Sequence, residues 1–179
     1  MGMKNIILIG MMGCGKTTVG ELLAMRLKKQ LVDTDKLIEA REGMTVAEIF
    51  ETQGEGYFRS LEMGMAQALS LRSDLIIACG GGLPLQEGAM AALKESGIVI
   101  WLDRDAGDIF DSEDMTARPL AQAGREAFLE RAAQRAPVYE KWADAAIHDF
   151  TSPVSTAARV KEAVEAITSW DEKKEGQSQ

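Results

Sequence analysis

Near its N-terminus the chain reads Gly10-Met11-Met12-Gly13-Cys14-Gly15-Lys16-Thr17, which fits the pattern GxxxxGK[ST]. A short apolar run at residues 6–9 precedes this stretch, and an amphipathic run at residues 16–29 follows it. Glycines let the backbone approach an anion closely, and the free N–H groups that begin a helix attract negative charge. The stretch therefore predicts a phosphate-binding loop between a buried strand and a helix.

Two side chains of this loop have expected partners on a bound nucleotide. Lys16 is placed to reach the β- and γ-phosphates, and the hydroxyl of Thr17 is placed to bind Mg²⁺. The pattern predicts nucleotide binding, but it does not by itself separate a kinase from an ATPase or a GTPase.

Beyond the loop, apolar runs alternate with amphipathic stretches, which is typical of a parallel sheet covered by helices. We expect strands at residues 6–9, 31–34, 75–79, 98–102 and 145–148. We expect helices at residues 16–29, 36–42, 46–52, 57–71, 87–95, 106–110, 125–135 and 154–170. The pattern predicts an α/β fold, a three-layer αβα domain with a five-stranded parallel sheet, over residues 1–170. Residues 171–179 are expected to form a polar, frayed tail.

Length and charge narrow the possible partners. The chain has 179 residues and a net charge of −8, which argues against nucleic-acid binding. We find neither an apolar run long enough to span a membrane nor a signal peptide, so we expect a cytoplasmic protein without a membrane partner. We also expect a monomer. An acidic chain that binds ATP must concentrate positive charge at the nucleotide site. Individual arginines are therefore candidate site residues.

Cys14 and Cys79 are the two cysteines, too few for a disulfide framework or a metal cluster. We expect buried or loop-lining thiols, with a chance disulfide between them as the alternative. His148, the one histidine, is interpreted as an ordinary residue at a strand end.

The second expected strand ends in Asp33-Thr34-Asp35, which carries two acidic residues. Ligands of open α/β sheets bind beyond the carboxyl ends of the strands, so both carboxylates are expected near the phosphates. A kinase needs one carboxylate to steer Mg²⁺ and another to orient or deprotonate the attacking hydroxyl. The alternative is a helix N-cap, and the two roles can coexist. Because the third strand ends without an aspartate, Asp33 is the better candidate for the magnesium site.

The third expected strand instead ends in Gly80-Gly81-Gly82, which can admit a substrate close to the backbone or can simply form a permissive turn. Arg59, Arg118 and Arg135 stand at the start of a helix, in the irregular segment and just before Pro137. Arginine suits the bidentate binding of carboxylate and phosphate, although each could be a solvated surface charge.

Together these motifs resemble those of the shikimate kinase family, in order and in spacing, from about residue 4 to residue 167. The phosphate loop is shared widely, whereas the other motifs together are far more specific. The matching pieces are residues 13–18 of the loop, Asp33-Thr34-Asp35, Phe58-Arg59 with Glu62 nearby, Gly80-Gly81-Gly82, Arg118-Pro119-Leu120, and Arg135-Ala136-Pro137 followed by Tyr139.

The resemblance implies a kinase that uses ATP and Mg²⁺ to phosphorylate the 3-hydroxyl of shikimate, on the route to chorismate and the aromatic amino acids. It places Thr17 and Asp33 at Mg²⁺. Lys16 and a closing lid at about residues 111–124 with Arg118 would act on the phosphates. The phosphates would be held by the backbone of Gly13, Cys14, Gly15, Lys16, Thr17 and Thr18.

The resemblance also assigns the acceptor side of the site. Asp35 is the expected base at the reacting hydroxyl. Arg59 and Arg135 are expected to clamp the substrate carboxylate. The backbone of Gly80, Gly81 and Gly82 is expected to contact the substrate.

One position departs from the family pattern. The family often carries an arginine that stacks on adenine just before the lid, and Asp111 stands there in this chain. Two further functions stay open: another small-metabolite kinase such as a gluconate kinase, and a non-catalytic nucleotide-binding paralogue. The triple glycine and residues 135–137 argue against the first. The presence of Lys16, Asp35 and Arg118 argues against the second.

Overall fold

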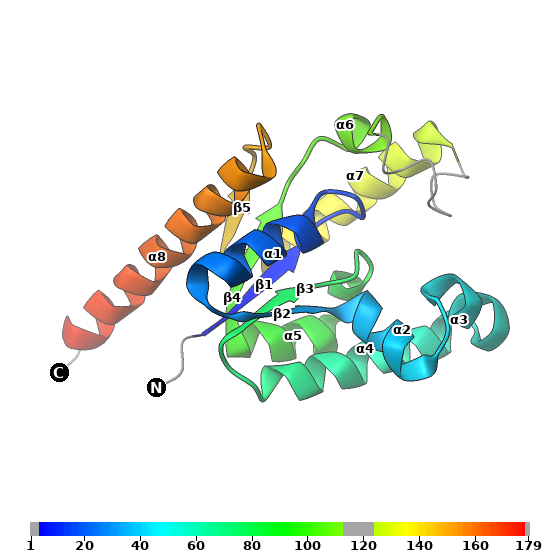
Figure 1. The fold of residues 1–179 in the computed structure, drawn as a ribbon, viewed down its shortest axis with the longest axis horizontal. Helices are drawn as coiled ribbons and strands as arrows, with labels where there is room; N and C mark the ends of the chain where they lie inside the picture. The colour runs from blue at the N-terminus through cyan, green and yellow to red at the C-terminus, as the bar shows by residue number, and fades with distance from the viewer. Residues whose placement is uncertain (1–3, 113–123, 178–179) are drawn as a thin grey trace.

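Five parallel strands form the centre of the computed structural model, which describes residues 4–112 and 124–177 (Figure 1). The strands lie in the order β2-β3-β1-β4-β5, so the strand that precedes the phosphate loop is central. On its two sides Ile6 pairs with Ile76 and with Ile98. The strands are β1 (Asn5–Ile9), β2 (Gln30–Asp33), β3 (Leu75–Ala78), β4 (Gly97–Leu102) and β5 (Ala145–Ile147).

Helices cover both faces of this sheet, which confirms the predicted three-layer αβα fold. In Figure 1, α1 and α8 lie side by side on one face, while α4 and α5 lie on the other. The helices are α1 (Lys16–Leu27), α2 (Thr34–Glu42), α3 (Val46–Gln53), α4 (Glu55–Ser70), η1 (Leu83–Leu85), α5 (Glu87–Ser96), α6 (Ala106–Phe110), α7 (Arg125–Trp142) and α8 (Pro153–Gln177).

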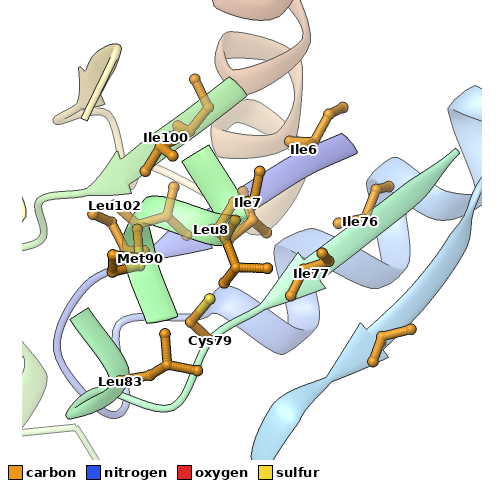
Figure 2. Close-up of a cluster of buried hydrophobic side chains, with 14 of the residues drawn as sticks. Ile6, Ile7, Leu8, Ile76, Ile77, Cys79, Leu83, Met90, Ile100 and Leu102 are labelled. Atoms are coloured by element: carbon orange, nitrogen blue, oxygen red, sulfur yellow. The ribbon is translucent and has the colours of Figure 1, made fainter. Parts of the chain in front are cut away.

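The core lies where β1 and β3 run side by side, and every residue of these two strands is buried. Because helices cover both faces of the sheet, the sequences of β1 and β3 are nearly continuous apolar runs and do not alternate between apolar and polar residues. Cys79, directly after β3, belongs to this buried cluster with Leu8 and Leu83 (Figure 2). Cys14 and Cys79 are both buried and free, so the alternative of a disulfide between them is wrong.

The predicted end of the helix at Arg135 is wrong, because α7 continues through Pro137 to Trp142. A proline inside a helix removes one backbone hydrogen bond and costs about 3 kcal/mol. Tertiary contacts of the last two turns offset this cost. The hydroxyl of Tyr139 donates to Gly81 O at 2.7 Å, and Trp142 Nε1 donates to Pro84 O at 3.2 Å. Local sequence rules could not anticipate these contacts.

The last helix is also longer than predicted, since α8 continues past Trp170 to Gln177. The added residues include glutamate, lysine and glutamine, which are good helix formers. In the described part of the chain, neither α8 nor any other helix combines the length and the apolar content of a bilayer span.

Candidate active site

A cavity of about 540 Å³ lies at the carboxyl ends of β1, β2 and β3. It gathers residues from the phosphate loop, from the start of α2, from α4 and from α7. Of the residues that the sequence proposed for the site, those lining the cavity are Gly13, Gly15, Lys16, Thr17, Thr18, Asp33, Asp35, Arg59, Gly80, Gly81, Gly82 and Arg135.

The phosphate loop is built by glycine. Gly13 and Gly15 have φ values of 78° and 102°, in the left-handed region where a side chain would be strained. The N-cap of α1 is Gly15, and no side chain caps the first turn, so its N–H groups remain open to a ligand. Lys16 Nζ donates to Gly10 O at 2.8 Å and to Met11 O at 2.7 Å.

Cys14 was proposed with its neighbours as part of the phosphate site, but it is not among the residues that line the cavity. Its side chain is buried, and its N–H donates to Met11 O at 3.2 Å within the loop. Its Sγ lies 3.7 Å from Lys16 Nζ. Cys14 therefore shapes the loop and helps to hold the lysine, while Gly13, Gly15 and Thr18 form the wall.

Thr17 and Asp33 meet across the mouth of the loop, where Thr17 Oγ1 donates to Asp33 Oδ2 at 2.7 Å. The other oxygen, Asp33 Oδ1, accepts the N–H groups of Asp35 at 3.1 Å and Lys36 at 3.2 Å as the N-cap of α2. One oxygen of Asp33 therefore caps α2, while the other lies beside the phosphate loop and binds Thr17. A hydroxyl and a carboxylate beside a phosphate site fit Mg²⁺, which prefers oxygen ligands and usually binds to substrate phosphates as well.

Asp35 lies in the first turn of α2 and faces the cavity. Its Oδ1 is shielded from solvent and has no hydrogen-bond partner among the described residues. Burial raises the pKa of Asp35 to about 6, the charge of Asp33 acts in the same direction, and Lys16 opposes both. A buried carboxylate with an unused oxygen and a raised pKa is suited to accept a proton near neutral pH.

Arg59 on α4 is held by two glutamates of the same helix. Its Nη1 donates to the buried Glu62 Oε2 at 2.6 Å, and its Nε and Nη2 donate to Glu55 Oε1 at 3.2 and 3.0 Å. Gln86 Nε2 donates to the same oxygen of Glu62. Since a guanidinium has five N–H donors, donors on both terminal nitrogens remain for a carboxylate in the cavity.

Phe50 and Phe58 pack in a tilted arrangement with ring centroids 4.9 Å apart, and the guanidinium of Arg59 lies 5.9 and 5.8 Å from the two centroids. With Val46 they form an apolar wall of the cavity. Our sequence analysis did not assign this wall, although Val46 and Phe50 are four residues apart on one helix face.

Each glycine of the triple-glycine segment packs against a different part of the site. A Cβ at Gly80 would overlap Asp35 Oδ1, and a Cβ at Gly82 would lie 2.7 Å from Arg59 Nη1. A Cβ at Gly81 would lie 3.2 Å from Met12 N and 3.4 Å from Arg135 Nη1. Close approach explains all three glycines, whereas a permissive turn would explain none of these contacts.

The backbone groups of this segment have distinct partners. Gly80 N–H donates to Thr34 Oγ1 at 2.8 Å, so it is not free for a substrate. Gly81 O accepts from Tyr139 Oη at 2.7 Å and from Arg135 Nη1 at 3.2 Å. The buried Thr34 was quoted within the Asp33-Thr34-Asp35 motif, but no role was predicted for its side chain.

Asp111, at the expected adenine position, is the C-cap of α6, and its Oδ1 lies 3.4 Å from Arg125 Nε at the start of α7. A guanidinium is therefore present beside the acid that replaces the family's arginine. Arg118 and most of the expected lid lie outside the described residues. His148 Nδ1 lies 3.1 Å from Asp103 Oδ2, away from the cavity residues.

A phosphate loop that shares one cavity with the carboxylate of Asp35 and the guanidinium groups of Arg59 and Arg135 is the arrangement of a P-loop phosphotransferase. The sequence model of the shikimate kinase family matches residues 12–168. The chain belongs to the shikimate kinase family and is an ATP-dependent kinase.

Individual relatives agree with this assignment. The shikimate kinase of Sulfurihydrogenibium sp. (strain YO3AOP1) is 41% identical over 138 residues, which cover 76% of this chain and 83% of that protein. The shikimate kinase of Acinetobacter baumannii, solved in complex with shikimate, is 33% identical with a TM-score of 0.82 over 93% of this chain and 94% of the other. A gluconokinase from Sinorhizobium meliloti has a TM-score of 0.59 at 18% identity over 98% of each chain, which shows the shared fold alone.

Proposed function

We propose that this protein transfers the γ-phosphoryl group of ATP to the 3-hydroxyl of shikimate, giving shikimate 3-phosphate and ADP. The observation that carries the proposal is the single cavity in which the phosphate loop faces Asp35, Arg59 and Arg135. A small anionic polyol needs both a cationic clamp and a hydroxyl acceptor, and both lie within reach of a transferring phosphoryl group. The two relatives named above that are more than 30% identical to this chain are shikimate kinases, which favours this acceptor over gluconate.

The residues divide the reaction as follows. Asp35 accepts the proton of the attacking hydroxyl while the new O–P bond forms and the bond from Pγ to the ADP oxygen breaks. Lys16 and the N–H groups at the start of α1 bind the phosphate oxygens. Arg59 and Arg135 bind the substrate carboxylate and hold the ring in line with the γ-phosphate. Such positioning and charge stabilisation supply most of the catalysis in phosphoryl transfer.

We also propose Mg²⁺ as the cofactor, held by Thr17 and Asp33 together with phosphate oxygens. Bound Mg²⁺ would neutralise charge on the phosphates. Arg118, on a lid at about residues 111–124, would add a positive charge when the lid closes over ATP. We further propose a cytoplasmic monomer without nucleic-acid or membrane partners, and the net charge of −8 supports the exclusion of nucleic acid.

An ADP-release assay with shikimate, with gluconate and without an acceptor tests the proposal. We expect turnover that depends on shikimate and stays at the background level with gluconate. A folded protein that binds ATP but shows no shikimate-dependent turnover would support the non-catalytic alternative. Turnover with gluconate alone would support the other kinase.

A further inference from the structure

Tyr139 is an unassigned residue whose contacts reach the centre of the site. It lies on α7, its side chain is buried, and its ring packs against Trp101 with centroids 5.9 Å apart. Its hydroxyl donates to Gly81 O at 2.7 Å and lies 3.7 Å from Met11 Sδ in the phosphate loop. Burial raises the pKa of Tyr139 to about 12, with Arg135 acting against it, so the hydroxyl remains a donor at working pH.

The carbonyl that Tyr139 holds belongs to the peptide unit between Gly81 and Gly82. In a trans peptide the N–H points opposite to the C=O. Fixing Gly81 O toward α7 therefore turns the N–H of Gly82 away from α7. Gly82 lines the cavity next to the guanidinium of Arg59. Among the described residues, its N–H donates no backbone hydrogen bond, whereas its carbonyl accepts from Leu85 N–H.

A second donor on the same carbonyl is expected to leave when the substrate binds. Arg135 Nη1 donates to Gly81 O at 3.2 Å. This inference rests on the proposed function, in which Arg135 binds the substrate carboxylate. Tyr139 is buried and cannot follow the substrate, so its hydroxyl is the donor that holds the peptide in both states.

We propose that Tyr139 is a positioning residue that fixes the Gly81–Gly82 peptide, so that Gly82 N–H and Arg59 stay aligned to receive the acceptor while Arg135 changes partners. This role concerns the acceptor and not the nucleotide. Loss of the hydroxyl should therefore raise the KM for shikimate and not the KM for ATP, whereas a general loss of packing would raise both.

The test is Tyr139→Phe, with Trp142→Phe as the matched variant. Tyr139→Phe keeps the ring and loses the hydroxyl, so we expect the KM for shikimate to rise about tenfold. The KM for ATP should stay within twofold, and the melting temperature should fall by only a few degrees, because the buried ring stays in place and Arg135 still satisfies Gly81 O. Trp142→Phe loses a hydrogen bond from the same helix to Pro84 O, and both KM values should stay within twofold of wild type.

Stability of a double variant gives a readout independent of turnover. In an Arg135→Ala background Gly81 O has only Tyr139, so Tyr139→Phe should lower the melting temperature more there than in wild type. The proposal is overturned by an unchanged shikimate KM, by equal rises in both KM values, or by an unfolded Tyr139→Phe protein. It is also overturned if Trp142→Phe has the same effect. Loss of shikimate turnover in wild type would instead refute the proposed function.

Discussion

Gly80 and Asp35 are in such close contact that a methyl group on the glycine would overlap the carboxylate, 2.9 Å from its Cγ. The glycine follows β3 and the aspartate follows β2, and these strands are paired with Asp33 opposite Ala78. The position of the proposed base is thus set by the absence of a side chain on the neighbouring strand.

We predict that Gly80→Ala lowers kcat/KM for shikimate about 100-fold, because Asp35 must move and a small displacement in a site is costly. ATP binding should change less than threefold. The matched variant is Gly64→Ala in α4, where a Cβ meets open space and a helix-compatible residue replaces glycine. Gly64→Ala should leave kinetics unchanged and stabilise the fold by about 0.5–1 kcal/mol. Equal kinetics for the two variants would contradict the close contact.

The acid limb of the pH profile should report Asp35. Because burial raises its pKa to about 6, the carboxylate is protonated below that pH and cannot accept the hydroxyl proton. We expect kcat/KM for shikimate to fall about tenfold per pH unit below about pH 6. Asp35→Asn should remove most turnover and leave ATP binding largely intact. Equal loss of both would show that Asp35 does not serve as the base.

The same residue should make stability depend on pH. Its pKa is higher in the folded protein than its ordinary value of 3.8, so the folded state holds the proton more tightly. Its stabilising contribution is fully present below about pH 4 and is lost as the pH rises through about 6. We expect Asp35→Asn to be more stable than wild type by about 1–2 kcal/mol at pH 8, with no difference at pH 4. Denaturant unfolding at both pH values measures this.

Two glutamates bind Arg59, and we expect only one of them to matter for the acceptor. Glu62 is 1% exposed and Glu55 is 65% exposed at the side chain. Exposed ion pairs contribute about 0–1 kcal/mol, whereas breaking a buried pair is much more costly. Glu62→Gln should raise the KM for shikimate about tenfold and leave that for ATP within twofold. Glu55→Gln should change neither, and steady-state kinetics with each substrate varied decides between them.

Asp33→Asn tests the proposed magnesium site. An asparagine oxygen can still cap α2, so stability should change by less than about 1 kcal/mol. Loss of the charge should raise the Mg²⁺ concentration at half-maximal rate about tenfold. Asp105→Asn, which changes the N-cap of α6 in the same way, should leave the Mg²⁺ dependence unchanged. An unchanged Mg²⁺ requirement in Asp33→Asn would place the metal elsewhere.

Much of this fold could be predicted from the sequence, because the signals for its strands and loops are local. The apolar run before Gly10 and the glycines of the loop predicted β1 and the start of α1, and the ends of β2 and β3 predicted where the acidic and glycine motifs would meet. The start of α3 has a local signal of the same kind, since Thr45 and Glu48 have the spacing of a capping box and form one in the structure. The roles assigned to the site residues remain predictions, although the described ones, other than the buried Cys14, all line one cavity.

The features that could not be predicted depend on contacts between residues that are distant in the sequence. Pro137 is a correct signal to end a helix in isolation, and only the bonds of Tyr139 and Trp142 to the loop after β3 reveal why α7 continues. Thr34 reads as a spacer between two acids until its hydroxyl is seen to bind Gly80 N–H. Such pairings follow from the folded sheet and leave no local pattern.

The central position of β1 has a consequence for how the chain is made. Its partners are far along the sequence, since Ile6 pairs with Ile76 and with Ile98. As the ribosome releases the chain, the phosphate loop emerges before β3 and β4, and β1 has no sheet partner until those two strands have followed. Such distant pairing slows folding and leaves an early apolar strand exposed. Nascent chains that end before residue 97 should therefore neither bind nucleotide nor resist proteases.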